Sequence, residues 1–233
     1  MNVTEQIYNI FDNEGKLKQL EYGLEAVYGC YQIIAIRGTE EIIFVSKKLP
    51  QQPLQAESHN SIFKLCDGLY TNITGLPADI NYIVNSSISL ASSKQYNLGC
   101  SVTPDVFTKS LAGKLQTRIQ KSSKRSPAFA SLIGGFENDV PMLYYTDMSA
   151  VEFPCYAYAA GEDSSKILKY LEKNYRSGDR KFCIQLGIAA LLESIGKDAE
   201  YSEIQVGIVT KKGLEHLSDQ EIEQTLQIIA ESY

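Results

Sequence analysis

Hydrophobic and polar positions divide the first third of the chain into one helix and four strands. In Leu17–Val27 the apolar residues recur at helical spacing on one face, and an Asn13-Glu14-Gly15 turn precedes them. Short runs rich in β-branched and aromatic residues follow, separated by turn residues. They predict strands over Gln32–Ile36, Glu41–Ser46, Ser61–Cys66 and Leu69–Thr74.

The remainder of the chain predicts paired helices, a block of strands, and a second set of helices. Pro77 and Pro104 favour helix starts, because proline suits the first turn of a helix. These helices are expected to run to Tyr96 and to about Gln120. The later elements are predicted as strands at Ala130–Phe136, Met142–Thr146 and Val151–Tyr156, helices at Ser164–Tyr175 and Asp179–Ile195, a strand at Glu203–Thr210, and a helix at Asp219–Glu231.

This order of elements favours one fold class. Strands in blocks and helices in pairs indicate antiparallel sheets with helices layered outside, rather than an alternating parallel sheet. No segment has the composition of a linker between domains. We therefore predict a single α+β domain over residues 1–233, with two stacked sheets between two helix layers in an αββα sandwich.

Composition narrows the classes of molecule that the protein is expected to bind. The chain has 44% apolar and 21% charged residues, which is typical of a globular protein. Its formal net charge of −6 argues against a nucleic-acid or anionic-membrane binder. There is no apolar run of roughly 18 residues and no signal-peptide pattern. We expect a protein of the cytoplasm and nucleus that binds neither nucleic acid nor membrane.

The residues show no metal or cofactor motif. The five cysteines are scattered without a C-x-x-C pair, and the only histidines are His59 and His216. Structural zinc sites need clustered ligands, so we expect no metal, no cofactor, and free, mostly buried thiols. The basic stretch Lys121–Arg125 is interpreted as a solvated loop. Gly134-Gly135, inside a predicted strand, indicates close packing or a bulge.

No hydrolytic site is visible either. Neither histidine lies in a nucleophile motif. Some hydrolases use a threonine with a free N-terminal amine, but neither Thr4 nor Thr39 stands at a plausible processing point. Taken alone, the residues predict an α+β domain without an active site.

The segment from Phe11 to Gly23 resembles the N-terminal signature of proteasome α subunits. Asp12-Asn13 stands where that signature has Ser-Pro, and Thr146–Ala150 (TDMSA) resembles the family's Thr-Asp-Pro-Ser-Gly turn. Gly75–Asp79 is similar to the turn that opens the family's first long helix. Lys47–Pro50 and Glu203–Thr210 resemble the subunit at the first α position, alpha type-6. The signature residues that match are Gly15, Lys16, Leu17, Gln19, Leu20, Glu21 and Tyr22.

The resemblance implies a structural role. Proteasome α subunits have the N-terminal nucleophile hydrolase-like fold but no catalytic residue; they form the heptameric outer ring of the 20S core. The expected partners are neighbouring α subunits, the β subunits of the adjacent ring, and a regulatory particle or other activator, in ATP- and ubiquitin-dependent protein degradation. Residues 1–30 would form the gate segment and signature helix, and residues 31–233 the sandwich. The helix at Leu17–Val27 would lie across the sandwich and pack against neighbouring subunits.

Two functional features are carried over residue by residue. The family's gate cluster aligns with Thr4, Glu5, Asn13 and Tyr22, of which only the tyrosine is unchanged. The pocket for a regulator's C-terminal tail aligns with Gly29, Ser61 and Leu76. Ser61 stands where the family has a lysine, so we expect weaker binding of the tail carboxylate, by roughly 1.5–3 kcal/mol. A tail paired with Lys64 instead would contradict this interpretation.

Two alternatives remain open at this level. One is an active hydrolase of the same fold, which would need cleavage that exposes a threonine directly before a strand. The other is an adaptor or scaffold unrelated to proteolysis, for which only the lack of a site argues. Both differ from the α-subunit hypothesis in the expected N-terminus or in the expected assembly.

Overall fold

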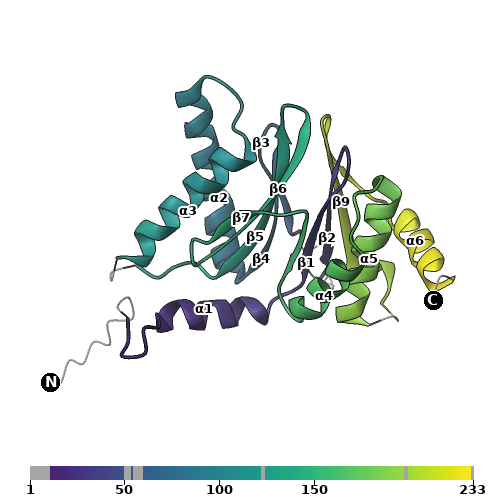
Figure 1. Ribbon diagram of the computed structural model, residues 1–233, viewed down its shortest axis with the longest axis horizontal. Helices are drawn as coiled ribbons and strands as arrows, with labels where there is room; N and C mark the ends of the chain where they lie inside the picture. The colour runs from purple at the N-terminus through teal and green to yellow at the C-terminus, as the bar shows by residue number, and fades with distance from the viewer. Residues whose placement is uncertain (1–10, 50–53, 55–59, 122–123, 197–198, 232–233) are drawn as a thin grey trace.

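Two five-stranded antiparallel sheets face each other at the centre of the molecule (Figure 1). The structure, a computed structural model, describes residues 11–49, 54, 60–121, 124–196 and 199–231. The first sheet has the strand order β10-β9-β2-β1-β8, formed by β1 (Ile33–Arg37), β2 (Ile42–Lys47), β8 (Ala157–Ala160), β9 (Ile204–Thr210) and β10 (Gly213–His216). The second has the order β3-β4-β5-β6-β7, formed by β3 (Ile62–Cys66), β4 (Leu69–Gly75), β5 (Phe129–Glu137), β6 (Val140–Asp147) and β7 (Glu152–Pro154).

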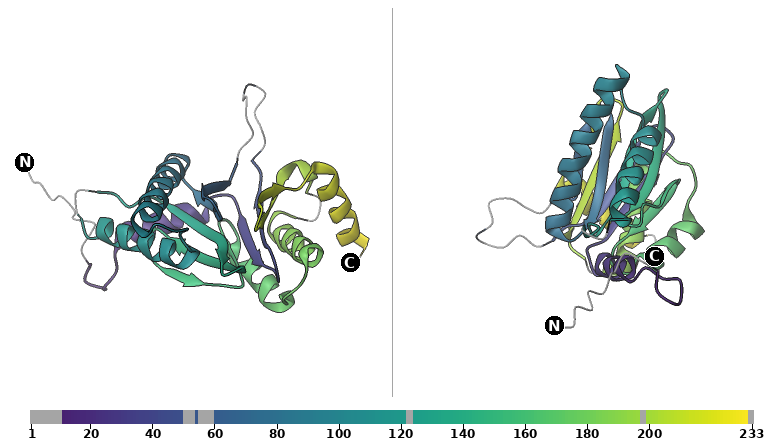
Figure 2. Two further views of the ribbon diagram at one scale, coloured as in Figure 1. Left: turned by 90° about the horizontal axis from the view of Figure 1, so that it is seen from above. Right: turned by 90° about the vertical axis from the view of Figure 1, so that its left-hand side faces the viewer.

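Helices cover the outer face of each sheet. The second sheet is covered by α2 (Pro77–Leu98) and α3 (Pro104–Ile119), and the first by α4 (Ser164–Asn174), α5 (Arg180–Ile195) and α6 (Asp219–Glu231) (Figures 1 and 2). The remaining helix, α1 (Lys18–Tyr28), lies across one end of the sandwich. The predicted αββα sandwich is therefore confirmed.

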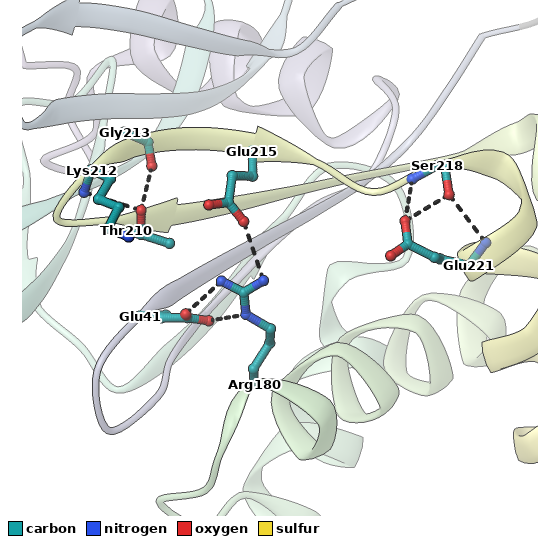
Figure 3. Close-up of polar contacts among 8 residues, drawn as sticks. All are labelled: Glu41, Arg180, Thr210, Lys212, Gly213, Glu215, Ser218 and Glu221. Atoms are coloured by element: carbon teal, nitrogen blue, oxygen red, sulfur yellow. Dashed lines mark hydrogen bonds and ion pairs between the residues drawn. The ribbon is translucent and has the colours of Figure 1, made fainter.

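Local side-chain bonds explain why the helix starts could be predicted. Thr103 Oγ1 caps α3 by accepting from the Val106 N–H, and Asp179 Oδ1 caps α5 by accepting from the Phe182 N–H at 3.2 Å. At α6, Glu221 Oε2 accepts from the Ser218 N–H at 2.9 Å, while the Glu221 N–H donates to Ser218 Oγ at 3.4 Å (Figure 3). This reciprocal capping box satisfies backbone donors that a helix start leaves free.

Strand β2 connects the two hydrophobic cores of the molecule. Its side chains alternate between faces, so that Phe44 packs between the sheets and Val45 packs toward α5. Gly134 and Gly187 allow these contacts. A Cβ atom on Gly134 would lie 2.9 Å from Phe44 Cζ, and one on Gly187 would lie 2.7 Å from Val45 Cγ2. The close packing expected at Gly134 is thus confirmed.

Two strands were missed. The strand predicted at Val151–Tyr156 is observed as the shorter β7, which pairs with β6 in the second sheet, but β8, which follows it at Ala157–Ala160 and pairs with β1 in the first sheet, was not predicted. The chain crosses from one sheet to the other between Pro154 and Ala157, and the hydrophobic pattern does not record such a crossing. Strand β10 was missed because it is short and ends in the exposed polar residues Glu215 and His216.

The described residues of the basic stretch lie in an exposed loop, as predicted, but Arg125 also forms an ion pair that the sequence did not indicate. Its guanidinium donates to both carboxylate oxygens of Asp79 in α2, at 2.7 and 2.6 Å, and the Ala128 N–H donates to the same carboxylate at 2.8 Å. Burial alone would raise the pKa of Asp79, but these hydrogen bonds outweigh it and hold the pKa below its usual value. Arg125 thereby fastens the loop to the start of α2.

The cysteines are all free, as expected, but they are less buried than expected. Only Cys183 is buried, Cys100 is exposed, and the other three are intermediate. Within the described residues, no helix is long and apolar enough to cross a membrane.

Candidate functional site at the N-terminal helix

A tight turn immediately precedes helix α1. Asp12 Oδ1 accepts hydrogen bonds from the N–H groups of Glu14 and Lys16, each at 2.9 Å, and Gly15 adopts a φ of +78°. The bond from Lys16 is the main reason that the pKa of Asp12 is lowered. Asp and Gly at these positions are typical turn residues, so the turn predicted over Asn13–Gly15 is confirmed.

The inner face of α1 closes the end of the sandwich. Gly23 and Val27 are buried, and Leu20 and Leu24 pack against the core between the sheets. Gly23 leaves room for the end of the Met148 side chain, which would have to move if a Cβ atom were added, because that atom would lie 2.2 Å from Met148 Cε. Helix α1 therefore packs on the Met148 side chain.

The TDMSA turn holds Met148 in that position. Asp147 Oδ1 accepts from the Ser149 N–H at 2.8 Å and from Ser149 Oγ at 2.5 Å. Ala150 has a φ of +64°, which favours glycine and disfavours alanine by about 1–2 kcal/mol. Sequence reasoning identified this turn by resemblance but missed its contact with α1, because Gly23 carries no side chain that would indicate a partner.

The outer face of α1 is uncovered. Tyr22 is 60% exposed and Tyr28 is 55% exposed, and Glu21 and Glu25 lie on the same exposed side. Of the other signature residues, Gly15 and Lys16 are exposed in the turn, while Leu17 and Gln19 are half-buried. Large exposed aromatic side chains indicate a surface that a partner covers.

Two of the three residues aligned with the regulator-tail pocket lie in segments that the structure brings together. Thr74 Oγ1 donates to the Tyr31 carbonyl at 2.6 Å, which brings the segment after α1 next to the segment before α2. Gly29 and Leu76 are exposed there. Ser61 differs, because its side chain is fully buried and its hydroxyl lies 2.6 Å from Ser46 Oγ. The pocket itself stays a prediction.

The gate residues are only partly described. Thr4 and Glu5 lie outside the described residues. Asn13 is exposed in the turn before α1, and Tyr22 is exposed on the helix. Their joint role in a gate cluster therefore stays a prediction.

The segment between α1 and β1 is packed against the second sheet. The chain runs directly from α1 through Tyr31 into β1, and the Tyr31 hydroxyl donates to the Ile73 carbonyl at 2.8 Å. Burial raises the pKa of this hydroxyl.

The other candidate residues do not assemble a catalytic group. Thr39 lies in the turn between β1 and β2, where its hydroxyl donates to the Gly178 carbonyl at 3.3 Å. His216 is exposed on β10, and His59 lies outside the described residues. Among the residues that the structure describes, no cluster of histidine, cysteine, aspartate and glutamate could hold a metal ion.

Two antiparallel sheets stacked between helix layers, with a further helix across one end, form the sandwich of the N-terminal nucleophile hydrolase-like fold. A family model described as "Proteasome subunit" matches residues 31–209. The chain belongs to the proteasome subunit family. It is 31% identical over 217 residues to the proteasome subunit alpha type-7-B of Arabidopsis thaliana, covering 92% of this chain and 87% of that protein.

Two further relatives agree. The proteasome subunit alpha type-7 of Trypanosoma brucei brucei is 30% identical, with 91% of this chain and 87% of that protein covered. That of Dictyostelium discoideum is 31% identical, with 94% and 88% covered. The chain is thus an α-type subunit, a non-catalytic component of the proteasome core that assembles with other proteasome subunits.

These findings correct one prediction and decide between the alternatives. The assignment to alpha type-6 is not supported, because these relatives are named alpha type-7. It had rested on two short stretches, one of which includes Pro50, outside the described residues. Neither the active hydrolase nor the unrelated scaffold is favoured by membership of this family as an α subunit.

Proposed function

We propose that this subunit occupies one place in the heptameric outer ring of the 20S core, between two other α subunits and above the β ring. The observation that supports this is the outer face of α1, where Tyr22 and Tyr28 are exposed although the inner face is fully packed. An amphipathic helix with aromatic residues on its outer face fits a subunit interface, where tyrosine is enriched.

The proposed role includes control of access to the proteolytic chamber. The segment before α1 would take part in the gate, and the pocket near Gly29 and Leu76 would receive the tail of a regulatory particle or other activator. The buried Ser61 hydroxyl supports the expectation that this pocket binds a tail carboxylate weakly. The setting would be ubiquitin-dependent degradation in the cytoplasm and nucleus.

The names of the relatives favour the alpha type-7 position in the ring. Cross-linking mass spectrometry of the purified assembly tests this position. Lys16 and Lys18, beside and within α1, are exposed and would react with a lysine cross-linker. We expect cross-links from these residues to the two subunits that flank an alpha type-7 subunit.

Cross-links to the two neighbours of a different α position would contradict the ring assignment but not ring membership. Cross-links to no α subunit would contradict both. Lys109, on helix α3 in the layer that covers the second sheet, is the control, since it should give a different set of partners.

A further inference from the structure

A groove of about 480 Å³ lies on the outer helix layer, between α4, α5 and α6. We call it the α4–α6 groove. It is on the side of the first sheet, away from the α2–α3 layer (Figure 1). Its polar rim includes Lys173, Asn174, Arg176 and Gln185, and none of the described residues that line it is acidic.

The surrounding structure holds Arg176 in place. Its guanidinium lies over the ring of Phe182, 4.4 Å from the ring centroid. The Phe182 ring packs on Gly178, where an added Cβ would lie 2.4 Å from Phe182 Cδ1. The Gly178 carbonyl in turn accepts from the Thr39 N–H at 3.1 Å. Because the cation rests on a fixed platform, less side-chain entropy is lost when a ligand binds it.

The two cations of the groove lack acidic partners. Among the described residues, neither Lys173 nor Arg176 forms an ion pair with a carboxylate. Arg180, in the first turn of α5, shows the opposite arrangement (Figure 3). It donates to both oxygens of Glu41 at 2.7 and 2.6 Å and to Glu215 at 3.2 Å. The positive charge of the groove is therefore unneutralised in a chain whose net charge is −6.

The groove is apolar between its cations. Leu186 and Ala189 of α5 form part of its wall, and Ile228 of α6 is 42% exposed at its edge. Two aromatic side chains, Tyr170 and Phe182, complete the lining. An apolar surface with cations beside it suits a segment whose apolar side chain is accompanied by carboxylates.

We infer that the α4–α6 groove binds an acidic peptide segment of a partner protein, with one apolar side chain packed on Leu186, Ala189 and Ile228. Carboxylates of the segment pair with Lys173 and Arg176, and the planar guanidinium of Arg176 accepts one of them in bidentate geometry. Charge complementarity selects this occupant, because the groove offers two unpaired cations and no anion. The inference rests on helices α4–α6 alone and is independent of the position of the subunit in the ring.

The probe is a library of 12-residue peptides, each with one apolar residue whose position varies across the library. The residues on both sides of it are glutamates in one series and lysines in the other. Binding to the full chain is measured by fluorescence polarisation. We expect binding only in the glutamate series, and weaker binding at higher salt because the charges are solvent-accessible. In the K173E/R176E double variant the affinity of the bound peptides should fall by at least about tenfold. Phe182→Ala should lower it by about two- to fivefold.

The matched control is K181E/K212E. These two lysines are exposed and lie outside the groove, one on α5 and one in the turn between β9 and β10, and their substitution changes the net charge equally. Its affinity should stay within about twofold of the unaltered chain, because neither side chain contacts the proposed ligand.

Three results would overturn the inference: no binding in the glutamate series, equal loss in both double variants, or equal binding of the lysine series. Incorporation of the variants into the assembled proteasome particle gives a further test. If K173E/R176E is excluded from proteasome particles while K181E/K212E is incorporated, the groove is a subunit interface and not a peptide site. Exclusion of both variants would point instead to a general effect of charge, which also contradicts the inference.

Discussion

Replacing Gly75 by alanine is expected to destabilise the fold by about 2–5 kcal/mol. Gly75 ends β4 with a φ of +147°, a conformation that residues with a side chain rarely adopt. A Cβ atom there would also lie 2.3 Å from the Ala128 carbonyl oxygen and 2.8 Å from Phe129 Cα. Both atoms belong to the backbone of the paired segment, so a rotamer change cannot relieve the overlap.

Gly68 offers a matched control for this substitution. It also has a positive φ, +76°, but no atom lies within 4 Å of the position of an added Cβ. Gly68→Ala should therefore cost only the backbone strain, about 1–2 kcal/mol. Urea denaturation of the full chain measures both. Equal midpoints for the two variants would contradict the close approach of β4 and β5 at Gly75.

Replacing Phe44 by alanine is expected to cost about 3–5 kcal/mol of unfolding free energy. The Phe44 side chain is fully buried between the sheets, and its ring faces Gly134 of the opposite sheet. Removing the ring loses its transfer free energy and leaves a cavity, which the glycine on the other side cannot fill. Thermal and urea unfolding of the full chain measure the loss.

Two other variants make this prediction specific. Phe44→Leu keeps most of the buried volume and should cost less, about 1–2 kcal/mol. Phe11→Ala removes a phenylalanine that is 70% exposed and should change stability by no more than about 0.5 kcal/mol. If Phe44→Ala were as mild as Phe11→Ala, the packing of the two sheets on this residue would be wrong.

Local signals explain the parts of the fold that the sequence predicts. The helix at Asp219–Glu231 was predicted at its observed bounds. Its Ser218–Glu221 capping box and its apolar stripe both consist of residues that are close together in the sequence. The turn before α1 is likewise local, since Asp12 and Gly15 supply the bond and the backbone conformation that it needs. Such features need no knowledge of distant segments.

Distant contacts explain the parts that the sequence did not predict. The ion pair of Arg125 was not predicted because its partner, Asp79, is 46 residues away. Strand β8 was not predicted because it joins a different sheet from β7, and its partner β1 lies far from it in the sequence. In the same way, no neighbour of Ser61 in the sequence indicates that the Ser61 hydroxyl lies in the interior and contacts the hydroxyl of Ser46. Each miss is a long-range pairing that leaves no mark on neighbouring residues.

The features of the candidate site also divide into local ones, which the sequence predicts, and contacts between distant segments, which it does not. The signature residues that build the turn and helix α1 could be identified from the sequence by resemblance. The contact of Met148 with Gly23 and the uncovered cations of the α4–α6 groove required the structure, because they join segments from different parts of the chain.

Native mass spectrometry of the protein, purified gently from its own cells, tests the central claim most directly. The account predicts recovery within a particle of several hundred kilodaltons, together with other proteasome subunits, and with an N-terminus that has not been trimmed to a threonine. Recovery as a lone chain of 25.9 kDa, or with a threonine as its new N-terminal residue, would contradict it.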